Sequence, residues 1–308
     1  MTEQLKLKLN DSKATRWGAL VIVAFTMMAA YYVNDVVAPL KTMLETDLAW
    51  SSTDFGFFTG GYSFLNVFFL MLIWGGLILD RFGIRFTGKL ATILMVGGTA
   101  LEYYAMTGLA GADATLFGIN EIFGYKTGVF VAFAGYSIFG VGAEVAGITV
   151  SKIIAKWFKG KELATAMGVQ VALARIGSQA GYAVAIPLAR AFGISTPVLL
   201  GLVLLLGGMI AFFIFAVMDK KLDKQMEAAA IAAGTEDEEE KFSFKDVKNI
   251  LVNPGFWLIA LLCVLFYSCV FPFQKFASEL MIIKYGINEN VAGTFAGLPA
   301  LGALILTP

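Results

Sequence analysis

The sequence contains no histidine, and only 15% of its 308 residues are charged. Histidine is the commonest metal ligand and the side chain that best exchanges protons near neutral pH. Its absence excludes catalytic triads that depend on an imidazole, and no other nucleophile, base and orienting group converge in the sequence. We therefore predict that the protein is not an enzyme and has no catalytic residues, no cofactor and no metal site.

Cysteine is also scarce, and neither sign of charge is in excess. Cys263 and Cys269 lie in one apolar stretch without zinc-type partners, so we expect them to be reduced packing residues. The 23 basic and 23 acidic residues give a formal net charge of +0. Nothing in this balance favours a nucleic-acid partner.

What the chain has in abundance is apolar side chains. Hydrophobic residues make up 58% of the sequence and aromatic residues 14%, whereas soluble domains carry about 25% charged residues. This composition predicts an all-α transmembrane protein with the lipid bilayer as its surroundings. The segments long enough to span the membrane as helices are residues 17–40, 54–79, 88–110, 127–153, 163–189, 197–218 and 255–282, and residues 291–308 are predicted to start an eighth helix.

The polar segments between these helices predict the domain organisation. The predicted parts are a basic tail (1–16), a six-helix bundle (17–218), a charged linker (219–254) with an acidic run (236–240), and the start of a second bundle (255–308). Because the last helix stops at Pro308 within its apolar run, we expect the chain to be a fragment. Most Lys and Arg residues fall on the side of the N-terminus, which predicts that the N-terminus lies inside.

Two ionisable residues lie deep inside this apolar sequence, Glu144 and Arg175. They are equidistant from the basic turn at 156–162, so two antiparallel helices would hold them at the same depth. Each is about 15 residues from the turn, or about 20 Å along a helix, near the middle of a hydrocarbon layer about 30 Å thick. Charges at that depth are costly unless they face each other, a cavity or a ligand. Two interpretations stay open here: a ligand-binding pair, or an ion pair that only joins the two helices.

The turn after the second apolar segment carries a spaced motif of two glycines, an acid and two arginines. Its members are Gly76, Asp80, Arg81, Gly83 and Arg85. A tight turn needs a glycine where the helix reverses, and the charged residues can bridge neighbouring helix ends. The motif resembles the signature loop of the major facilitator superfamily, where it acts as a conformational-switch loop between the second and third helices. The resemblance implies the major facilitator fold and a secondary transporter that works by alternating access.

Further segments resemble one branch of this superfamily, that of the lysosomal dipeptide transporter and its prokaryotic relatives. The segments are 31–35, 38–40 and 61–66, together with the spacing of Glu144 and Arg175. In that branch the matching acid and arginine are implicated in holding the two termini of a dipeptide. The resemblance therefore implies that Glu144 and Arg175 bind substrate. It covers residues 17–190 and becomes loose from 255 onward.

Other residues in the predicted helices are weaker candidates for the same substrate site: Asp35, Tyr62, Asn66, Tyr136, Tyr267 and Gln274. Each has a structural alternative, since Asp35 can cap a helix at the interface and aromatic residues in membrane helices often only pack. Tyr267, Pro272 and Gln274 also predict a break in the helix 255–282, where freed carbonyls would line a cavity. Glu102 is left open between packing and proton handling, and Lys275 and Glu279 are expected at the outer interface.

Three functions are compatible with the sequence. The first is transport of dipeptides or similar small zwitterions. The second is a major facilitator carrier for a small organic anion or sugar phosphate, with Arg175 as its anchor, and the third is a non-transporting membrane receptor. A drug exporter is disfavoured because the segment 163–189 lacks the Gly-Pro signature of drug/proton antiporters.

Localisation and assembly are predicted from signals that the sequence lacks. The N-terminal tail has no acidic dileucine motif, and the outer loops have no glycosylation sequon. These absences favour the cytoplasmic membrane of a prokaryote over a lysosomal membrane. We expect a monomer, and the coupling ion, if there is one, stays open.

Overall fold

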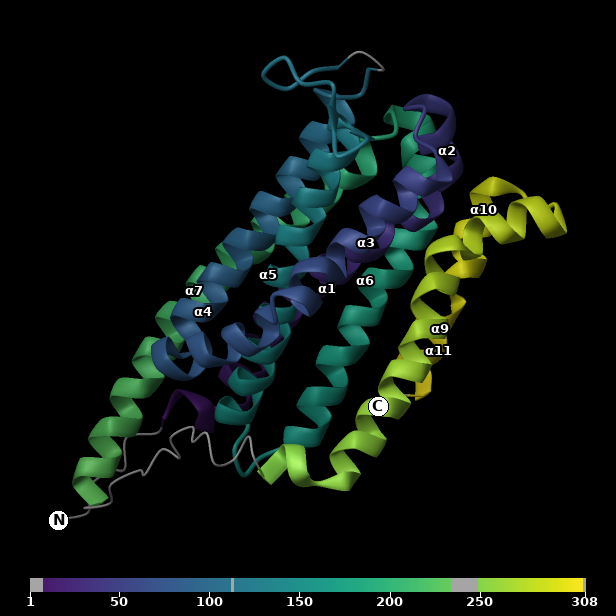
Figure 1. Ribbon diagram of the computed structural model, residues 1–308. Helices are drawn as coiled ribbons and strands as arrows, with labels where there is room; N and C mark the ends of the chain where they lie inside the picture. Colours follow the sequence, from purple (N-terminus) through teal and green to yellow (C-terminus); the bar gives the residue numbers. More distant parts are fainter. Residues whose placement is uncertain (1–7, 112–113, 234–248, 307–308) are drawn as a thin grey trace.

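The computed structural model describes residues 8–111, 114–233 and 249–306, and long helices make up nearly all of them (Figure 1). The predicted acidic run 236–240 and Pro308 lie outside the described residues, as does the start of the N-terminal tail. The elements before the largest gap are η1 (Leu9–Asp11), α1 (Lys13–Val36), η2 (Ala38–Leu40), α2 (Lys41–Asp47), α3 (Ser52–Phe68), α4 (Met71–Thr107), β1 (Glu121–Ile122), β2 (Tyr125–Lys126), α5 (Thr127–Trp157), α6 (Leu163–Phe192) and α7 (Thr196–Ala233). After it come α9 (Pro254–Tyr285), α10 (Glu289–Ala296) and α11 (Leu298–Leu306).

Small polar residues and proline set where several helices begin. Ser12 caps α1 by accepting a hydrogen bond from the Thr15 amide, and Ser51 forms a reciprocal capping box with Asp54 at the start of α3. Asn253 caps α9, whose first residue, Pro254, needs no hydrogen bond for its nitrogen. These local signals place α3 and α9 within two residues of the predicted starts.

Close approach at glycines joins the helices into a bundle. A methyl group at Gly135 of α5 would lie 2.7 Å from the carbonyl oxygen of Gly98 on α4. A methyl at Gly181 of α6 would lie 2.9 Å from the carbonyl oxygen of Tyr32 on α1. Helices in a bilayer gain no hydrophobic driving force from one another, so such small-residue contacts supply the packing.

The second and third predicted helices differ from the structure in where they break. The helix that starts at Ser52 ends at Phe68, Leu70 adopts a left-handed conformation (φ 52°), and α3 and α4 meet at a bend of 58°. The predicted turn near residues 80–87 survives only as one non-helical residue, Gly83 (φ 75°, ψ 172°), inside α4. No local pattern marks the first break, because the apolar run continues through it.

Three other predicted helices differ from the structure in their extent or continuity. The helix predicted at 197–218 continues as α7 to Ala233, into the predicted linker, because its alanine-rich continuation favours helix. The predicted break at Pro272 is wrong, since α9 is continuous through this residue. The apolar run predicted at 291–308 is divided instead into α10 and α11 at Gly297.

Among the described residues, four helices are long and apolar enough to cross a membrane, or five if the bent pair α3–α4 counts as one span. They include α1, α5, α7 and α9. α6 is 30 residues long but is not among them, because Arg175, Gln170 and Gln179 interrupt its apolar sequence. These polar residues, Arg175 among them, distinguish α6 from the more apolar helices around it.

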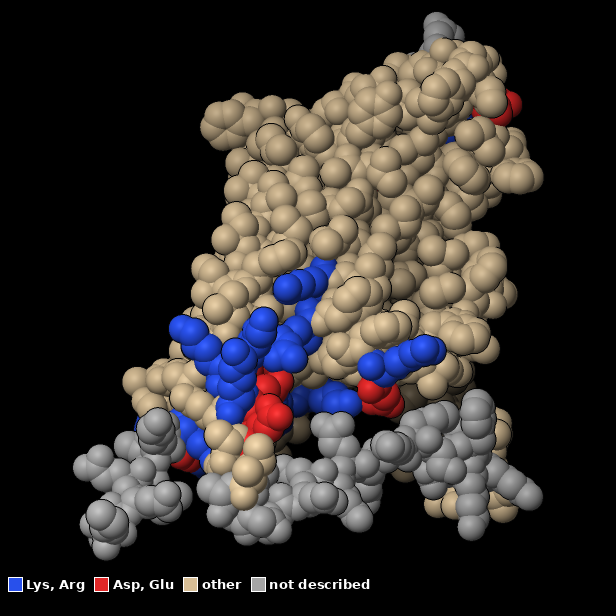
Figure 2. All heavy atoms as spheres, turned by 90° about the vertical axis from the view of Figure 1, so that its left-hand side faces the viewer, with Lys and Arg blue, Asp and Glu red and all other residues tan. Residues whose placement is uncertain are grey.

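Basic and acidic side chains gather toward one end of the face that α4 and α7 share (Figure 2). Lys156 of α5 forms ion pairs with Asp219 and Asp223 of α7, and Arg16 of α1 pairs with Glu162 at 2.8 Å. Ion pairs at this end join helices that are far apart in the sequence.

Candidate functional site

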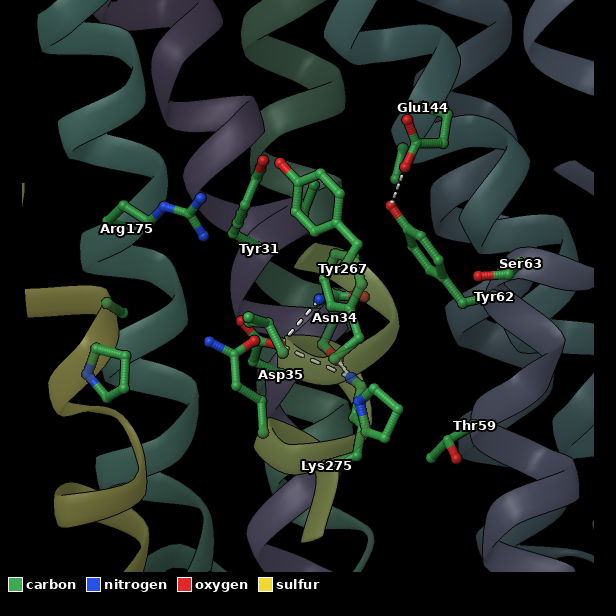
Figure 3. Close-up of a pocket in the computed structure, with 18 of the residues that line it drawn as sticks. Tyr31, Asn34, Asp35, Thr59, Tyr62, Ser63, Glu144, Arg175, Tyr267 and Lys275 are labelled. Atoms are coloured by element: carbon green, nitrogen blue, oxygen red, sulfur yellow. Dashed lines mark hydrogen bonds and ion pairs between the residues drawn. The ribbon is translucent and has the colours of Figure 1, made fainter. Parts of the chain in front are cut away.

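A cavity of about 920 Å³ opens among α1, α3, α5, α6, α9 and α11. Its lining is mainly apolar and aromatic, but it includes two acids and two bases: Asp35, Glu144, Arg175 and Lys275. Ligand sites commonly combine an apolar lining with a few polar groups of this kind. Figure 3 shows these residues as they project from their helices.

Glu144 of α5 faces the cavity and is held by a tyrosine from α3. Its carboxylate accepts a hydrogen bond of 2.7 Å from the Tyr62 hydroxyl. The backbones approach closely here, since a methyl group at Gly140 would overlap the carbonyl oxygen of Tyr62. One carboxylate oxygen is thus fixed in place, and no basic side chain among the described residues pairs with Glu144.

Arg175 of α6 faces the same cavity. Its guanidinium carbon lies 5.4 Å from the centre of the Tyr31 ring on α1, a cation–π distance. In Figure 3, Tyr31 and Tyr267 lie between Arg175 and Glu144. Within the described part of the chain, no ion pair joins the two charged residues. The structure thus lacks the direct Glu144–Arg175 pair that was the alternative to ligand binding.

The remaining predicted substrate residues divide into two groups. Asp35, Tyr267 and Gln274 line the cavity, as Tyr62 does. Asn66 does not line it, and its amide instead donates to the carbonyl of Tyr62 at 3.0 Å. Tyr136 lies behind the lining with its side chain fully buried, and its hydroxyl donates to the carbonyl of Asn34 at 2.7 Å.

Lys275 of α9 is the cavity residue that sequence reasoning placed wrongly. It was expected at the outer interface, but its ammonium lies 3.7 Å from Asp35 and donates to the carbonyl of Asn34 and the hydroxyl of Tyr136. The missed signal is the distance of Lys275 from the end of its helix. Ten residues of α9 follow it, so it lies well inside the span. Glu279, one turn further, pairs instead with Lys41.

Glu102 of α4 lies away from the cavity lining. Its side chain is fully buried, and neither carboxylate oxygen has a hydrogen-bond partner among the described residues. The amide nitrogen of Glu102 is close to Gly135, so the residue lies at the tight α4–α5 contact. Glu102 therefore lies in the contact between α4 and α5 and outside the cavity lining.

The signature-loop residues lie at the end of the molecule where the ion pairs gather. Asp80 accepts from Lys152 of α5 at 2.8 Å, and Arg85 donates to Asp223 of α7 at 2.8 Å. Gly83 supplies the positive φ between them, while Arg81 lies over the ring of Phe82. The ring centroid is 5.6 Å from the Arg81 guanidinium, and a methyl at Gly76 would contact nothing within 4 Å. The loop therefore connects α4 to both α5 and α7.

The cavity can accommodate a small molecule that carries both signs of charge. Arg175 offers a planar fork of donors suited to a carboxylate. The carboxylate of Glu144 offers acceptor capacity to an ammonium group, since only one hydrogen bond from the described residues reaches it. The tyrosines between them supply apolar faces, which a ligand backbone can contact.

Comparison with known proteins agrees with this architecture. The family model of the Major Facilitator Superfamily matches residues 20–308. Lysosomal dipeptide transporter MFSD1 of Pongo abelii is 27% identical over 287 residues, which is 89% of this chain and 55% of that protein. The same transporter from Danio rerio is 27% identical over 280 residues (87% and 55%), and that from Gallus gallus is 33% identical over 171 residues (51% and 36%). The chain thus spans about half the length of the curated relatives that it matches.

Proposed function

This chain belongs to the Major Facilitator Superfamily, and we propose that it transports dipeptides or similar small zwitterions by alternating access. Family and relatives indicate a multi-pass membrane transporter rather than an enzyme. One observation carries the choice of cargo. Glu144 and Arg175 face a single cavity, and neither has an ionic partner among the described side chains.

The chemistry of a dipeptide matches these two anchors. Its carboxylate suits bidentate contact with the Arg175 guanidinium, and its ammonium suits the carboxylate of Glu144. Unpaired charges within a bilayer are costly, so a ligand that supplies both counter-charges binds favourably. Such a site recognises the two ends of the peptide and does not select by the size of its side chains.

A thermal-shift assay of the protein against three forms of one dipeptide tests this proposal. The forms are the free dipeptide, its N-acetylated derivative and its C-amidated derivative. We expect the free dipeptide to raise the melting temperature and each blocked form to have little effect, since binding stabilises the folded state. Equal stabilisation by all three forms would rule out recognition of both termini.

A second candidate is a carrier for a small organic anion or sugar phosphate, favoured by the absence of any ion pair to Arg175 among the described residues. In that case Arg175 is the sole anchor. Binding of a carboxylate without an amine would then survive Glu144→Gln, whereas the dipeptide proposal expects that variant to lose its preference for a free amine.

The same proposal includes topology and assembly. Residues 17–218 belong to the first bundle of the carrier, 219–254 to the connection, and 255–308 to the second bundle. The N-terminus lies inside, supported by the basic residues near Arg85 and Lys156. We infer a monomer in the cytoplasmic membrane of a prokaryote, while the similar vertebrate proteins are named as lysosomal. The loop Gly76 to Arg85 takes part in switching between conformations.

A further inference from the structure

The cavity contains a second pair of opposite charges besides its two proposed anchors. Asp35 of α1 and Lys275 of α9 lie 3.7 Å apart, with side chains 11% and 14% exposed. The Lys275 ammonium also donates to the Asn34 carbonyl and the Tyr136 hydroxyl, so helices α1 and α5 hold it from one side. In Figure 3 this pair lies apart from Arg175 and Glu144.

Asp35 and Lys275 are not joined by a direct hydrogen bond, so each charged group can still interact with a molecule in the cavity. Asp35 accepts a hydrogen bond of 2.8 Å from the Asn34 side chain, but 3.7 Å to Lys275 is longer than a hydrogen bond. By contrast, Lys41 and Glu45 outside the cavity are 2.7 Å apart. Both Asp35 and Lys275 line the cavity, so a bound molecule lies close to both charges.

The four charged lining residues sum to zero formal charge. A dipeptide with uncharged side chains is also neutral overall, so the occupied cavity stays neutral. A dipeptide with a lysine or glutamate side chain brings one extra charge into a region of low dielectric. An uncompensated charge at membrane depth is costly.

We propose that Asp35 and Lys275 balance each other's charge in the cavity, so that it favours substrates with no net charge. This inference rests on the proposed function and deepens it. Glu144 and Arg175 bind the two ends of the substrate. Asp35 and Lys275 determine whether the cavity itself carries a net charge. The site is then indifferent to the size of a side chain but sensitive to its charge.

The experiment measures binding of three dipeptides of similar size whose variable side chain is neutral, basic or acidic. The wild-type protein is expected to favour the neutral one. Lys275→Met leaves one negative charge in excess, which at an effective dielectric of about 20 and a separation of about 12 Å should strengthen binding of the basic dipeptide and weaken binding of the acidic one by about tenfold each. The ratio of basic to acidic dipeptide should therefore rise by about a hundredfold. Asp35→Asn should shift the same ratio downward by a similar factor. The double variant should return toward the wild-type order.

Control variants separate charge selection from effects on folding or gating. Lys284→Met removes an exposed lysine of the same helix, and Glu279→Gln removes the partner of Lys41 outside the cavity lining. Neither should change the ratio of basic to acidic dipeptide. Where Lys275→Met fails to fold, Lys275→Gln, which retains hydrogen-bond donors for Asn34 and Tyr136, provides the same loss of charge.

The outcomes also distinguish this inference from the function on which it rests. If free dipeptides bind and blocked ones do not, but Lys275 and Asp35 variants leave the ratio unchanged, charge selection by this pair is wrong and the dipeptide proposal stands. A change that is equal for all three dipeptides assigns the pair to folding or gating and likewise overturns the inference. If the wild-type protein binds no free dipeptide, both fail.

Discussion

Tyr62 holds Glu144 at the cavity through a single hydrogen bond of 2.7 Å. Tyr62→Phe removes the donor and leaves the ring in place. We expect binding of a free dipeptide to weaken by about tenfold, since a hydrogen bond to a charged group contributes about 1.5–3 kcal/mol. Binding of an N-acetylated dipeptide, which lacks the ammonium, should change little.

Isothermal titration of the two dipeptides measures this difference. Tyr104→Phe is the matched control, because Tyr104 lies on α4 with 45% of its surface exposed and outside the cavity lining. An equal loss for the free and the acetylated dipeptide would show that Tyr62 acts by packing and not through Glu144.

Single residues in the cavity differ in how well the sequence predicts them. Glu144 and Arg175 interrupt long apolar runs, so their burial is costly and their position conspicuous. Lys275 was misplaced because it lies toward the end of α9, close to Lys284, where lysines commonly extend to the interface. The contacts of its ammonium with Asn34 and Tyr136 place it at the cavity.

At the scale of helices, the α4–α5 contact depends on glycine. Gly135→Ala would bring a methyl group to 2.7 Å from the Gly98 carbonyl and 2.9 Å from the Glu102 amide, so the helices must move apart. We expect a loss of about 1–3 kcal/mol of stability. Gly97→Ala is the matched control, since nothing lies within 4 Å of a methyl there and alanine favours helix.

Thermal unfolding in detergent measures both variants. The account expects a lower melting temperature for Gly135→Ala and an unchanged or higher one for Gly97→Ala. Equal melting temperatures for the two would contradict the claim that backbone proximity at Gly135 holds these helices together.

The contact between the N-terminal segment and the α5–α6 loop should depend on pH. The Arg16 guanidinium, which hydrogen-bonds Glu162, lowers the pKa of that carboxyl, and Lys161 does the same to the pKa of Asp11. A lowered pKa in the folded state means that the contact stabilises the protein at neutral pH. That contribution is fully present above the ordinary carboxyl pKa and is lost as the pH falls through the lowered folded-state pKa, where the carboxyls become protonated.

Unfolding of the wild type and of Glu162→Gln between neutral and acidic pH tests this dependence. The wild type should be the more stable at neutral pH, and the difference should disappear in acid. Glu227→Gln, on an exposed residue of α7, should show no such pattern. A difference for Glu162→Gln that persists in acid would contradict the account.

Helix existence follows from the sequence far better than helix breaks. The apolar runs predicted the main helices, because their length and composition leave few alternatives. Leu70 takes its left-handed conformation inside an apolar run, where no sequence pattern marks it. The division between α10 and α11 falls at Gly297, where a methyl group would clash with the Gln179 side chain, a contact that no local pattern reveals. The alanine-rich stretch up to Ala233 favours helix, but the sequence does not show that it continues the helix predicted at 197–218 without a break.

At the scale of the whole molecule, the proposed orientation places the α5–α6 loop inside and the β1–β2 hairpin outside. This orientation can be measured by labelling single cysteines introduced into a variant in which Cys263 and Cys269 are replaced by alanine. Phe123→Cys, at an 88% exposed hairpin residue, should react with an impermeant reagent added to intact cells. Lys159→Cys, on the exposed α5–α6 loop, should react only after permeabilisation. The reverse pattern would invert the topology.

The alternation of apolar and polar segments predicts where helices lie along the chain, but it does not predict the cavity. Residues of α1, α3, α5, α6, α9 and α11 line it, and no local pattern relates these six elements. Their meeting depends on bundle packing, in which Gly140 and Gly181 permit close approach.

The most direct test of the central claim is exchange of labelled dipeptide by the protein reconstituted in liposomes, compared between the free and the N-acetylated forms. The account predicts that the wild type exchanges the free form and excludes the acetylated one, and that Glu144→Gln loses this preference. A Glu144→Gln variant that still prefers the free form as strongly as the wild type would contradict the assignment of Glu144 to the substrate amine.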